Sequence, residues 1–370
     1  MRIGIDITPL TAQPTGVGRY LGPVIEHMGP MLGEDSLTGW ATGLHAPAHG
    51  AGGLSRRYLP LPTRALWAWW RAVPWPPVDS LLGGVDVFHA TNYHLPPVAR
   101  ARRVLTIYDL AFMVEPRWAS PKIVGPFARR VPRFAREADT VITCSMHSRE
   151  DIVRLCGVEP DKVHVVHGAV GPDMRPVERD IARARMRELL GLDAPYVLHV
   201  GTIESRKNIE TLVRAFALSC NRRPHRLLLV GMPGWNMGHF GELVAREGLA
   251  DRVLMPGYLP SREDLAAAYS AADLFVMPSH YEGFGLPALE AMACGCPVLA
   301  SDSSSLPEVG GGAAGYFPAM DTQALAALMG EVLENPELAG EMSRLGTAQA
   351  ARFDWTESAR RTLEVYRSLA

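Results

Sequence analysis

The 370-residue chain has almost no net charge, few cysteines and no long apolar run, and each lack excludes a class of protein. A formal net charge of −2 gives no overall attraction to nucleic acid. The five cysteines form no Cys-x-x-Cys pair, which suits buried thiols in a reducing cytosol. No apolar stretch of about 18 residues predicts a transmembrane helix, and the early charge of Arg2 argues against a signal peptide. The sequence therefore predicts a cytoplasmic protein.

Two metal-binding patterns are also missing. The chain contains neither Asp-x-Asp nor His-Glu-x-x-His. A metal-held diphosphate is therefore not indicated, and cations from the protein would have to replace the metal. We expect no cofactor and no metal requirement.

The composition and the rhythm of the chain predict two α/β domains. A hydrophobic content of 47% is enough for two packed cores. Short apolar runs alternate with helical patterns, which is typical of parallel sheets covered by helices. The predicted fold has two doubly wound, Rossmann-like domains facing a central cleft, at residues 1–172 and 173–353, and a last helix at 354–370 that crosses back to the first domain. Predicted strands lie at 2–7, 85–90, 104–108, 140–144, 163–166, 196–200, 226–230, 252–255, 274–277 and 297–300.

The most informative motif sets Glu282 and Glu290 apart by seven residues, with a Gly-Phe-Gly turn and Pro287 between them. Proline is a frequent first helical residue, so Glu290 is expected in the first turn of a helix and Glu282 in the loop before it. The N–H groups of the turn would lie between the two acids and favour anionic oxygens. A nucleotide sugar has that chemistry. The alternative is that both acids are solvated residues at the start of a helix.

Two further patterns suit a diphosphate. Gly16-Val17-Gly18 lies between a strand and a helix, where bare backbone N–H groups approach phosphate closely. The next glycine comes too late for the dinucleotide fingerprint, which argues against an NAD enzyme. Arg206 and Lys207 precede a predicted helix at 208–219, where fixed cations would stabilise a leaving diphosphate. The alternatives are a turn that requires positive φ at the glycines and a solvated basic pair.

With these motifs, with Tyr196-Val-Leu-His-Val-Gly-Thr-Ile-Glu-Ser-Arg-Lys-Asn208 and with Phe353-Asp-Trp355, the whole chain resembles the family 4 retaining glycosyltransferases. The resemblance implies a GT-B architecture, a nucleotide-sugar donor in the second domain, an acceptor in the first, and transfer with retention of configuration. It makes Glu282 the acid near the donor sugar and Glu290 the acid that binds ribose. The implied catalytic residues are Arg206, Lys207, Glu282 and Asp109, and the implied donor contacts are Gly16, Val17, Gly18, Thr202, Tyr258, Leu259, Gly283, Phe284, Gly285, Leu286 and Glu290.

The chain departs from the family pattern in two places. Tyr108 replaces the histidine that many relatives have before Asp109, and a tyrosine cannot shuttle protons near neutral pH. Retaining transfer of this type is generally thought to use the leaving phosphate as base, so activity can survive the change. Thr202 stands where many relatives have an arginine. On the acceptor side the resemblance implies His89, Asn92 and Tyr108; the alternative for a lone histidine is a structural role.

A basic segment and a group of tryptophans suggest the location of the acceptor. Residues 122–136 place four arginines around apolar positions, and tryptophans stand at 67, 69, 70 and 75. The charge of residues 1–173 is +3 and that of the remainder is −5. A basic amphipathic helix with exposed tryptophan suits peripheral contact with the inner membrane and a lipid-linked acceptor. The alternative, which we favour slightly, is a core helix with a solvated basic face.

Among family members the motifs look most like those of mannosyl- and rhamnosyltransferases, so GDP-mannose is the first candidate donor. Two other hypotheses stay open. One is a nucleotide-sugar epimerase of the same fold, against which the complete Glu-x7-Glu motif argues. The other is a catalytically inactive subunit that binds a nucleotide sugar, for which only Tyr108 argues.

Overall fold

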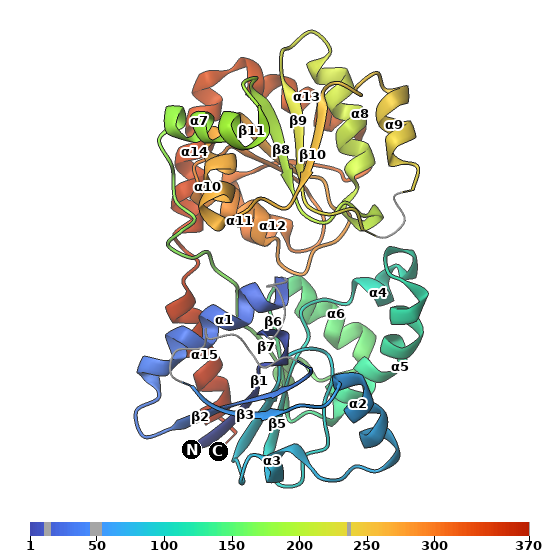
Figure 1. Cartoon of the computed structure of the whole chain (residues 1–370), viewed down its shortest axis with the longest axis vertical. Helices are drawn as coiled ribbons and strands as arrows, with labels where there is room; N and C mark the ends of the chain where they lie inside the picture. The colour runs from blue at the N-terminus through green and yellow to red at the C-terminus, as the bar shows by residue number, and fades with distance from the viewer. Residues whose placement is uncertain (11–15, 45–53, 235–237, 370) are drawn as a thin grey trace. The chain divides into compact units, whose positions relative to one another are not determined.

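The computed structural model describes residues 1–10, 16–44, 54–234 and 238–369, apart from the side chains at 122 and 123. It divides into two compact units. The first consists of Met1–Val114, Pro121–Gly168 and Asp354–Ala370, and the second of Glu115–Ser120 and Ala169–Phe353. Each unit is a parallel sheet covered by helices (Figure 1).

The sheet of the first unit has seven strands in the order β3-β2-β1-β4-β5-β6-β7. Every neighbouring pair is parallel. The strands are β1 Arg2–Asp6, β2 Ser36–Thr42, β3 Ser55–Leu59, β4 Val87–Ala90, β5 Arg102–Thr106, β6 Thr140–Thr143 and β7 Val163–Val165. The helices are α1 Gly16–Met28, α2 Thr63–Ala72, α3 Val78–Leu81, α4 Ala111–Val114, α5 Pro121–Glu137, α6 Met146–Cys156 and α15 Trp355–Arg367.

The sheet of the second unit has six parallel strands in the order β10-β9-β8-β11-β12-β13. The strands are β8 Tyr196–Val200, β9 Arg226–Val230, β10 Val253–Gly257, β11 Leu274–Met277, β12 Val298–Ser301 and β13 Gly315–Phe317. The helices are α7 Arg179–Leu190, α8 Ile209–Cys220, α9 Phe240–Arg246, α10 Arg262–Ala271, α11 Leu286–Ala293, α12 Leu306–Gly310, α13 Thr322–Glu334 and α14 Pro336–Ala350.

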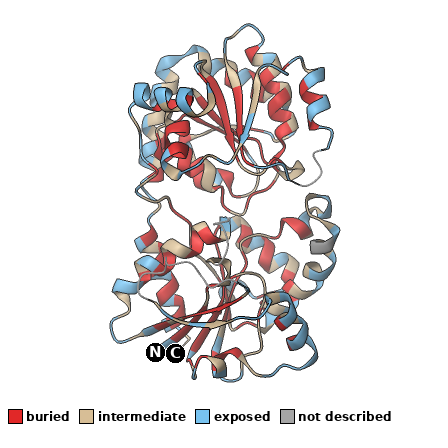
Figure 2. Ribbon diagram, viewed as in Figure 1, coloured by how far each residue is buried: buried red, intermediate tan, exposed pale blue. Residues whose placement is uncertain are grey.

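Burial explains why these segments form central strands. In β4, β6, β8, β11 and β12 every residue is buried, because helices cover both faces of each sheet (Figure 2). Capping residues begin the helices: the Ser145 hydroxyl accepts from the N–H of Ser148 at the start of α6, and Asp354 accepts from the N–H of Thr356 at the start of α15. The predicted pair of doubly wound sheets is therefore confirmed.

Three strands were not predicted, and none of them is a continuous apolar run of four residues or more. β3 lies at the edge of its sheet and is partly exposed along its length. β2 contains serine, glycine and two threonines, and β13 has only three residues. The predicted strands otherwise agree with the observed ones to within about two residues at each end, which is the usual uncertainty of strand limits.

Candidate functional site

The candidate site lies at the carboxyl ends of β8 and β11 in the second unit. These neighbouring strands are where the strand order reverses, because β9 and β10 lie on one side of β8 and β12 and β13 lie beyond β11. Ligands of open α/β sheets bind outside the carboxyl ends of strands at such a switch point. The loop after β8 carries Arg206 and Lys207, and the loop after β11 carries Glu282.

The three side chains contact one another. Lys207 Nζ lies 2.7 Å from Glu282 Oε1, and Arg206 Nη1 lies 3.3 Å from Glu282 Oε2. Arg206 also donates to the Tyr281 carbonyl at 2.7 Å and to Glu204 Oε1 at 2.9 Å. Two cations thus share one buried carboxylate, so neither is the solvated basic residue of the alternative interpretation.

The cations decide the charge of Glu282. Burial alone would raise the pKa of its carboxyl, but Lys207 and Arg206 outweigh burial and lower the pKa to about 2. Glu282 is therefore ionised near neutral pH, and it is 6% exposed. The loop can present positive charge to an anionic ligand while the carboxylate accepts hydrogen bonds from hydroxyl groups.

The loop that carries Glu282 is fixed by the segment after β12. The Glu282 N–H donates to Ser304 Oγ at 2.7 Å, and Ser305 Oγ donates to the carbonyls of Glu282 and Phe284 at 3.0 and 2.9 Å. Gly285 has φ 103°, and a Cβ there would lie 2.8 Å from Leu306 Cδ2. Only glycine fits this turn without strain.

Asn208 joins three loops at the same edge of the sheet. It has φ 54° and precedes α8, but its side chain makes no capping bond there, contrary to the expected helix cap. Its Nδ2 instead donates to the carbonyls of Pro278 and Ala319 at 2.9 and 2.6 Å, and its Oδ1 accepts from Thr211 Oγ1 at 2.8 Å. Asn208 therefore holds the loops after β8, β11 and β13 together.

Glu290 has partners of its own on α10. Its carboxylate accepts from Tyr269 Oη at 3.2 Å and from Arg262 Nη1 at 3.4 Å, and it is 3% exposed. Helix α11 begins at Leu286, one residue before Pro287, and has no acid in its first turn. The expected place of Glu290 in that turn is therefore wrong by about one residue. Glu290 is also buried, so it is not the solvated residue of the alternative.

The remaining predicted donor contacts of this unit follow β8, β10 and β11. Thr202 follows β8, and Tyr258 and Leu259 follow β10, where the Tyr258 side chain is 64% exposed. Phe284 is buried with its ring edge-on to Phe353, at a centroid distance of 5.7 Å. Gly283 directly precedes Phe284 in the turn before α11, and Leu286 is the first residue of α11.

In the first unit, Gly16, Val17 and Gly18 are the opening residues of α1 rather than a loop. None of the described glycines with positive φ is among them, so the interpretation as a turn requiring positive φ is wrong. The residues immediately before them, 11–15, lie outside the described part of the chain.

His89 needs a correction. It lies on β4 and is 4% exposed, with Nδ1 2.6 Å from Tyr366 Oη and Nε2 2.6 Å from Thr106 Oγ1. Burial lowers its pKa to about 3, so the ring is neutral. Protein groups occupy both nitrogens, which makes His89 a structural residue rather than one that faces an acceptor.

Asn92, Tyr108 and Asp109 follow β4 and β5, at the carboxyl edge of the first sheet. Asp109 Oδ1 accepts from the N–H of Ala111, and the Asp109 N–H donates to Tyr93 Oη at 3.2 Å. The Tyr108 ring lies edge-on to Tyr20, and its hydroxyl is buried without a hydrogen-bond partner among the residues that the structure describes. Burial raises the pKa of Tyr108 well above its usual value, so the phenol stays protonated.

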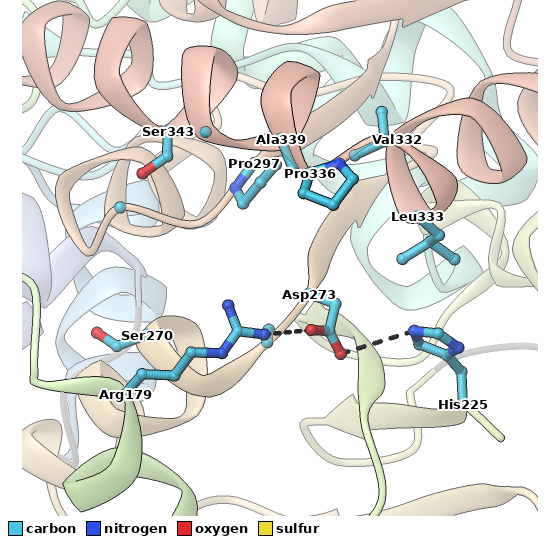
Figure 3. A pocket seen from close by; sticks show the side chains of 13 residues that line it. Arg179, His225, Ser270, Asp273, Pro297, Val332, Leu333, Pro336, Ala339 and Ser343 are labelled. Carbon is cyan, nitrogen blue, oxygen red and sulfur yellow. Dashed lines mark hydrogen bonds and ion pairs between the residues drawn. The ribbon is translucent and has the colours of Figure 1, made fainter.

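One cavity lies away from this chemistry. It has a volume of about 410 Å³, and its lining combines His225, Asp273 and Pro297, which directly precede β9, β11 and β12, with residues of α13 and α14 (Figure 3). A smaller cavity of about 270 Å³ is lined by Ser205 and Asn208, which flank Arg206 and Lys207. Arg206, Lys207, Glu282 and Glu290 line neither of these cavities, so we place the site by the charged cluster itself rather than by a cavity.

The described residues include no group of three His, Cys, Asp or Glu side chains arranged to hold a metal. No helix within the described ranges is both long and apolar enough to cross a membrane. Helix α5 buries Val131 and Ala135 and exposes Arg129, Arg133 and Arg136, so it is a core helix with a basic solvated face.

The sequence interpretation missed several residues that shape the site. Ser304, Ser305, Tyr269 and Arg262 hold the two motif acids but carry no local signal, since each acts across 20 residues or more. Glu204 has a signal that could have been used: an acid two residues before Arg206 in the same loop pairs with it readily.

Comparison with known proteins gives the family of the chain. Residues 180–349 match the family model "Glycosyl transferases group 1", and residues 35–173 match "Glycosyltransferase Family 4". The chain is 32% identical over 285 residues to the O-antigen chain mannosyltransferase B of Escherichia coli, which covers 76% of this chain and 74% of the relative. It is 32% identical over 348 residues to the D-inositol 3-phosphate glycosyltransferase of Xylanimonas cellulosilytica, covering 87% and 81%.

The fold is similar to that of Anabaena HepE, solved in complex with UDP and glucose. The TM-score is 0.78 at 19% identity, and the similarity covers 100% of both chains. The two sheets are therefore those of the GT-B fold, as the sequence predicted. Together with the family models and the two relatives, the fold shows that the chain belongs to the group 1, family 4 glycosyltransferases.

Proposed function

We propose that this glycosyltransferase moves a hexose, with mannose from GDP-mannose as the first candidate, to a saccharide or lipid-linked saccharide with retention of configuration. The observation that carries the proposal is the cluster in which Arg206 and Lys207 surround the buried Glu282 at the switch point. The E. coli relative's name as an O-antigen chain mannosyltransferase supports the choice of sugar and acceptor class.

In this scheme the cationic side chains bind the diphosphate and the carboxylates bind hydroxyl groups. Arg206 and Lys207 would hold the donor diphosphate and stabilise the charge that develops on it as the sugar leaves. Glu282 would accept from hydroxyls of the donor sugar, and Glu290 from the vicinal hydroxyls of ribose. The leaving phosphate would take the acceptor's proton, and Asp109 would orient the acceptor. In this scheme no cofactor is needed, and the protein's cations serve in place of a metal.

Thermal-shift binding against a panel of nucleotides and nucleotide sugars tests the donor site. A ligand at a hundred times its Kd stabilises the protein by about 2.7 kcal/mol. We expect one base and one sugar to shift the wild type, and Lys207→Ala and Glu290→Ala to reduce that shift at the same ligand concentration. Lys162→Ala, a partly buried lysine of the first unit that donates to the Arg136 carbonyl, is the matched control and should keep it. If no nucleotide shifts the wild type, the proposal fails.

The anomeric outcome needs a separate measurement. With GDP-mannose as donor, retention gives an α-linked product, which NMR of the new anomeric signal distinguishes from a β-linked one. A β-linked product would contradict retention while leaving the donor site intact.

We also propose peripheral contact of the first unit with the cytoplasmic face of the inner membrane. Around α2 the side chains of Leu61, Trp69, Val73 and Trp75 are 41–66% exposed, and Arg64 and Arg71 are exposed beside them. The Trp69 Nε1–H donates to the Trp75 carbonyl at 2.7 Å, which fixes the end of the helix. Exposed tryptophan beside arginine suits a lipid interface with anionic headgroups.

Flotation with phosphatidylglycerol vesicles tests this contact. We expect the wild type to float, Trp69→Ala with Trp75→Ala to stay in the soluble fraction, and phosphatidylcholine vesicles to recruit less protein. Trp118→Ala, in the second unit, is the control and should float like the wild type. A wild type that stays wholly soluble contradicts the contact.

A further inference from the structure

His199, a buried histidine on β8, has one ring nitrogen that bonds neither Lys207 nor Glu282 of the charged cluster. His199 lies on β8 and is fully buried, with its ring parallel to that of Phe275. Its Nδ1 lies 2.9 Å from the Val276 carbonyl oxygen. A carbonyl only accepts, so Nδ1 carries the hydrogen. Burial lowers the pKa of His199 to about 4, which keeps the ring neutral. Nε2 therefore presents a lone pair and can only accept.

This Nε2 is buried and has no hydrogen-bond partner in the described part of the chain. A buried acceptor without a partner is costly, and in native proteins such a group usually meets a water or a ligand. A Cβ at Gly201 would lie 3.3 Å from His199 Nε2 and 3.8 Å from Lys207 Nζ. Both nitrogens therefore lie within 4 Å of the place that the absent Gly201 side chain leaves, which we call the gap beside Gly201.

The ammonium has hydrogens to spare for this gap. Lys207 carries three N–H donors, and one of them bonds Glu282 Oε1. A second can point into the gap, and the third stays available for a diphosphate oxygen.

We propose that His199 is a positioning residue that binds, together with Lys207, one hydroxyl group in the gap beside Gly201. The hydroxyl oxygen would accept from Lys207 Nζ and donate its hydrogen to His199 Nε2. A phosphate or carboxylate oxygen has no hydrogen to donate and would face the lone pair, so the gap selects against it. The hydroxyl belongs either to a water that orients Lys207 or to the donor sugar, and the second source rests on the proposed function.

Titration calorimetry with GDP and GDP-mannose tests the inference, with UDP and UDP-glucose as the second pair. His199→Phe keeps a flat ring against Phe275 and removes both nitrogens. We expect it to weaken GDP-mannose binding about tenfold, the usual effect of one lost hydrogen bond. A water in the gap predicts the same loss for GDP, whereas a sugar hydroxyl predicts a loss for GDP-mannose alone. Either pattern supports the inference.

A double-mutant cycle separates positioning from a merely structural role. In a Lys207→Ala background the hydroxyl has already lost its donor, so His199→Phe should cost little more. His89→Phe, the same change at a buried histidine of the first unit, is the control; it should lower Tm and leave the affinity unchanged. Equal affinity of His199→Phe and the wild type, or an equal loss in both backgrounds, overturns the inference.

The inference and the proposed function can fail independently. If the wild type binds none of these nucleotides, the proposed function fails. In that case 15N NMR of the imidazole still decides about the gap. An unprotonated Nε2 whose shift indicates an accepted hydrogen bond supports the inference, and a protonated Nε2, or one with no hydrogen bond, overturns it.

Discussion

Lys207 Nζ lies 2.7 Å from Glu282 Oε1, and both side chains are less than a tenth exposed. Replacing only one partner leaves a buried charge less well compensated. For Lys207→Ala we expect a loss of about 3 kcal/mol in the free energy of unfolding, measured by urea at pH 7. The paired change Lys207→Met with Glu282→Leu should recover most of that stability and still lack donor binding. If the free energy of unfolding of Lys207→Ala lay within about 0.5 kcal/mol of that of the wild type, the pair of Lys207 and Glu282 would not be a major source of stability.

Two buried neutral histidines predict acid sensitivity. The pKa of His89 is lowered from 6.5 to about 3 and that of His199 to about 4, both by burial. The unfolded chain therefore takes up protons first as the pH falls, and stability that is complete above pH 6.5 is lost below it. Each histidine should cost about 1.4 kcal/mol per pH unit between pH 6 and pH 4.5.

Urea unfolding at pH 7, 6 and 5 measures this slope. Ionised Glu282 also stabilises the fold less in acid, but mainly below its unfolded pKa of 4.5. The window above pH 4.5 therefore reports the buried histidines, including His94, whose pKa burial lowers to about 4. His89→Gln should reduce the slope by about 1.4 kcal/mol per pH unit, which is the contribution of one proton. A free energy of unfolding that stays constant from pH 7 to pH 5 would show that the two rings are not buried neutral groups.

We expect the side chain of Asn208 to contribute more to stability than its positive-φ backbone conformation does. Asn208→Gly keeps the positive φ but loses the two bonds to the Pro278 and Ala319 carbonyls, so we expect a loss of about 1–3 kcal/mol. Asn208→Asp is expected to be worse, because its carboxylate would face two carbonyl oxygens. Thermal unfolding of both variants, with Asn221→Gly as control, measures the difference. Equal Tm values for Asn208→Asp and the wild type would refute this account.

The hydroxyl of Tyr108 is expected to contribute no stability. It is buried and unpaired among the described atoms, so Tyr108→Phe should leave the free energy of unfolding unchanged or raise it slightly. Activity measured on the same variant tests the acceptor-side role. A loss of turnover without a loss of stability would show that the hydroxyl meets the acceptor during the reaction.

Chelation tests the expectation that no metal is needed. With Arg206 and Lys207 holding the diphosphate, we expect transfer rates in excess EDTA to equal those with added Mg²⁺ or Mn²⁺. A loss of activity in EDTA that added metal restores would show that the two cations are not sufficient.

The architecture could be predicted from the sequence because most of the strands are recognisable from local runs of apolar residues. Fully buried strands such as β8 and β11 appear as continuous apolar runs, whereas β3 and β13 depend on neighbouring strands that local patterns do not show. At the site, Arg206 and Glu282 could be placed at ends of parallel strands, which share one edge of a sheet.

What could not be predicted depends on packing between distant helices and strands. The bonds of Glu290 to Tyr269 and Arg262 require α10 to lie against α11. His89 illustrates the same limit, because its partner Tyr366 is 277 residues away and nothing near His89 in the sequence announces it.

That distant partner has a consequence for synthesis. Helix α15 belongs to the first unit and supplies Tyr366 to His89 and the Ser358 hydroxyl to the His167 carbonyl. The ribosome makes the sheet of the first unit early, but the whole second unit emerges before α15 does. The unit whose sheet is made first is thus completed last. Until α15 has been made, the part of the core that α15 covers stays exposed to solvent.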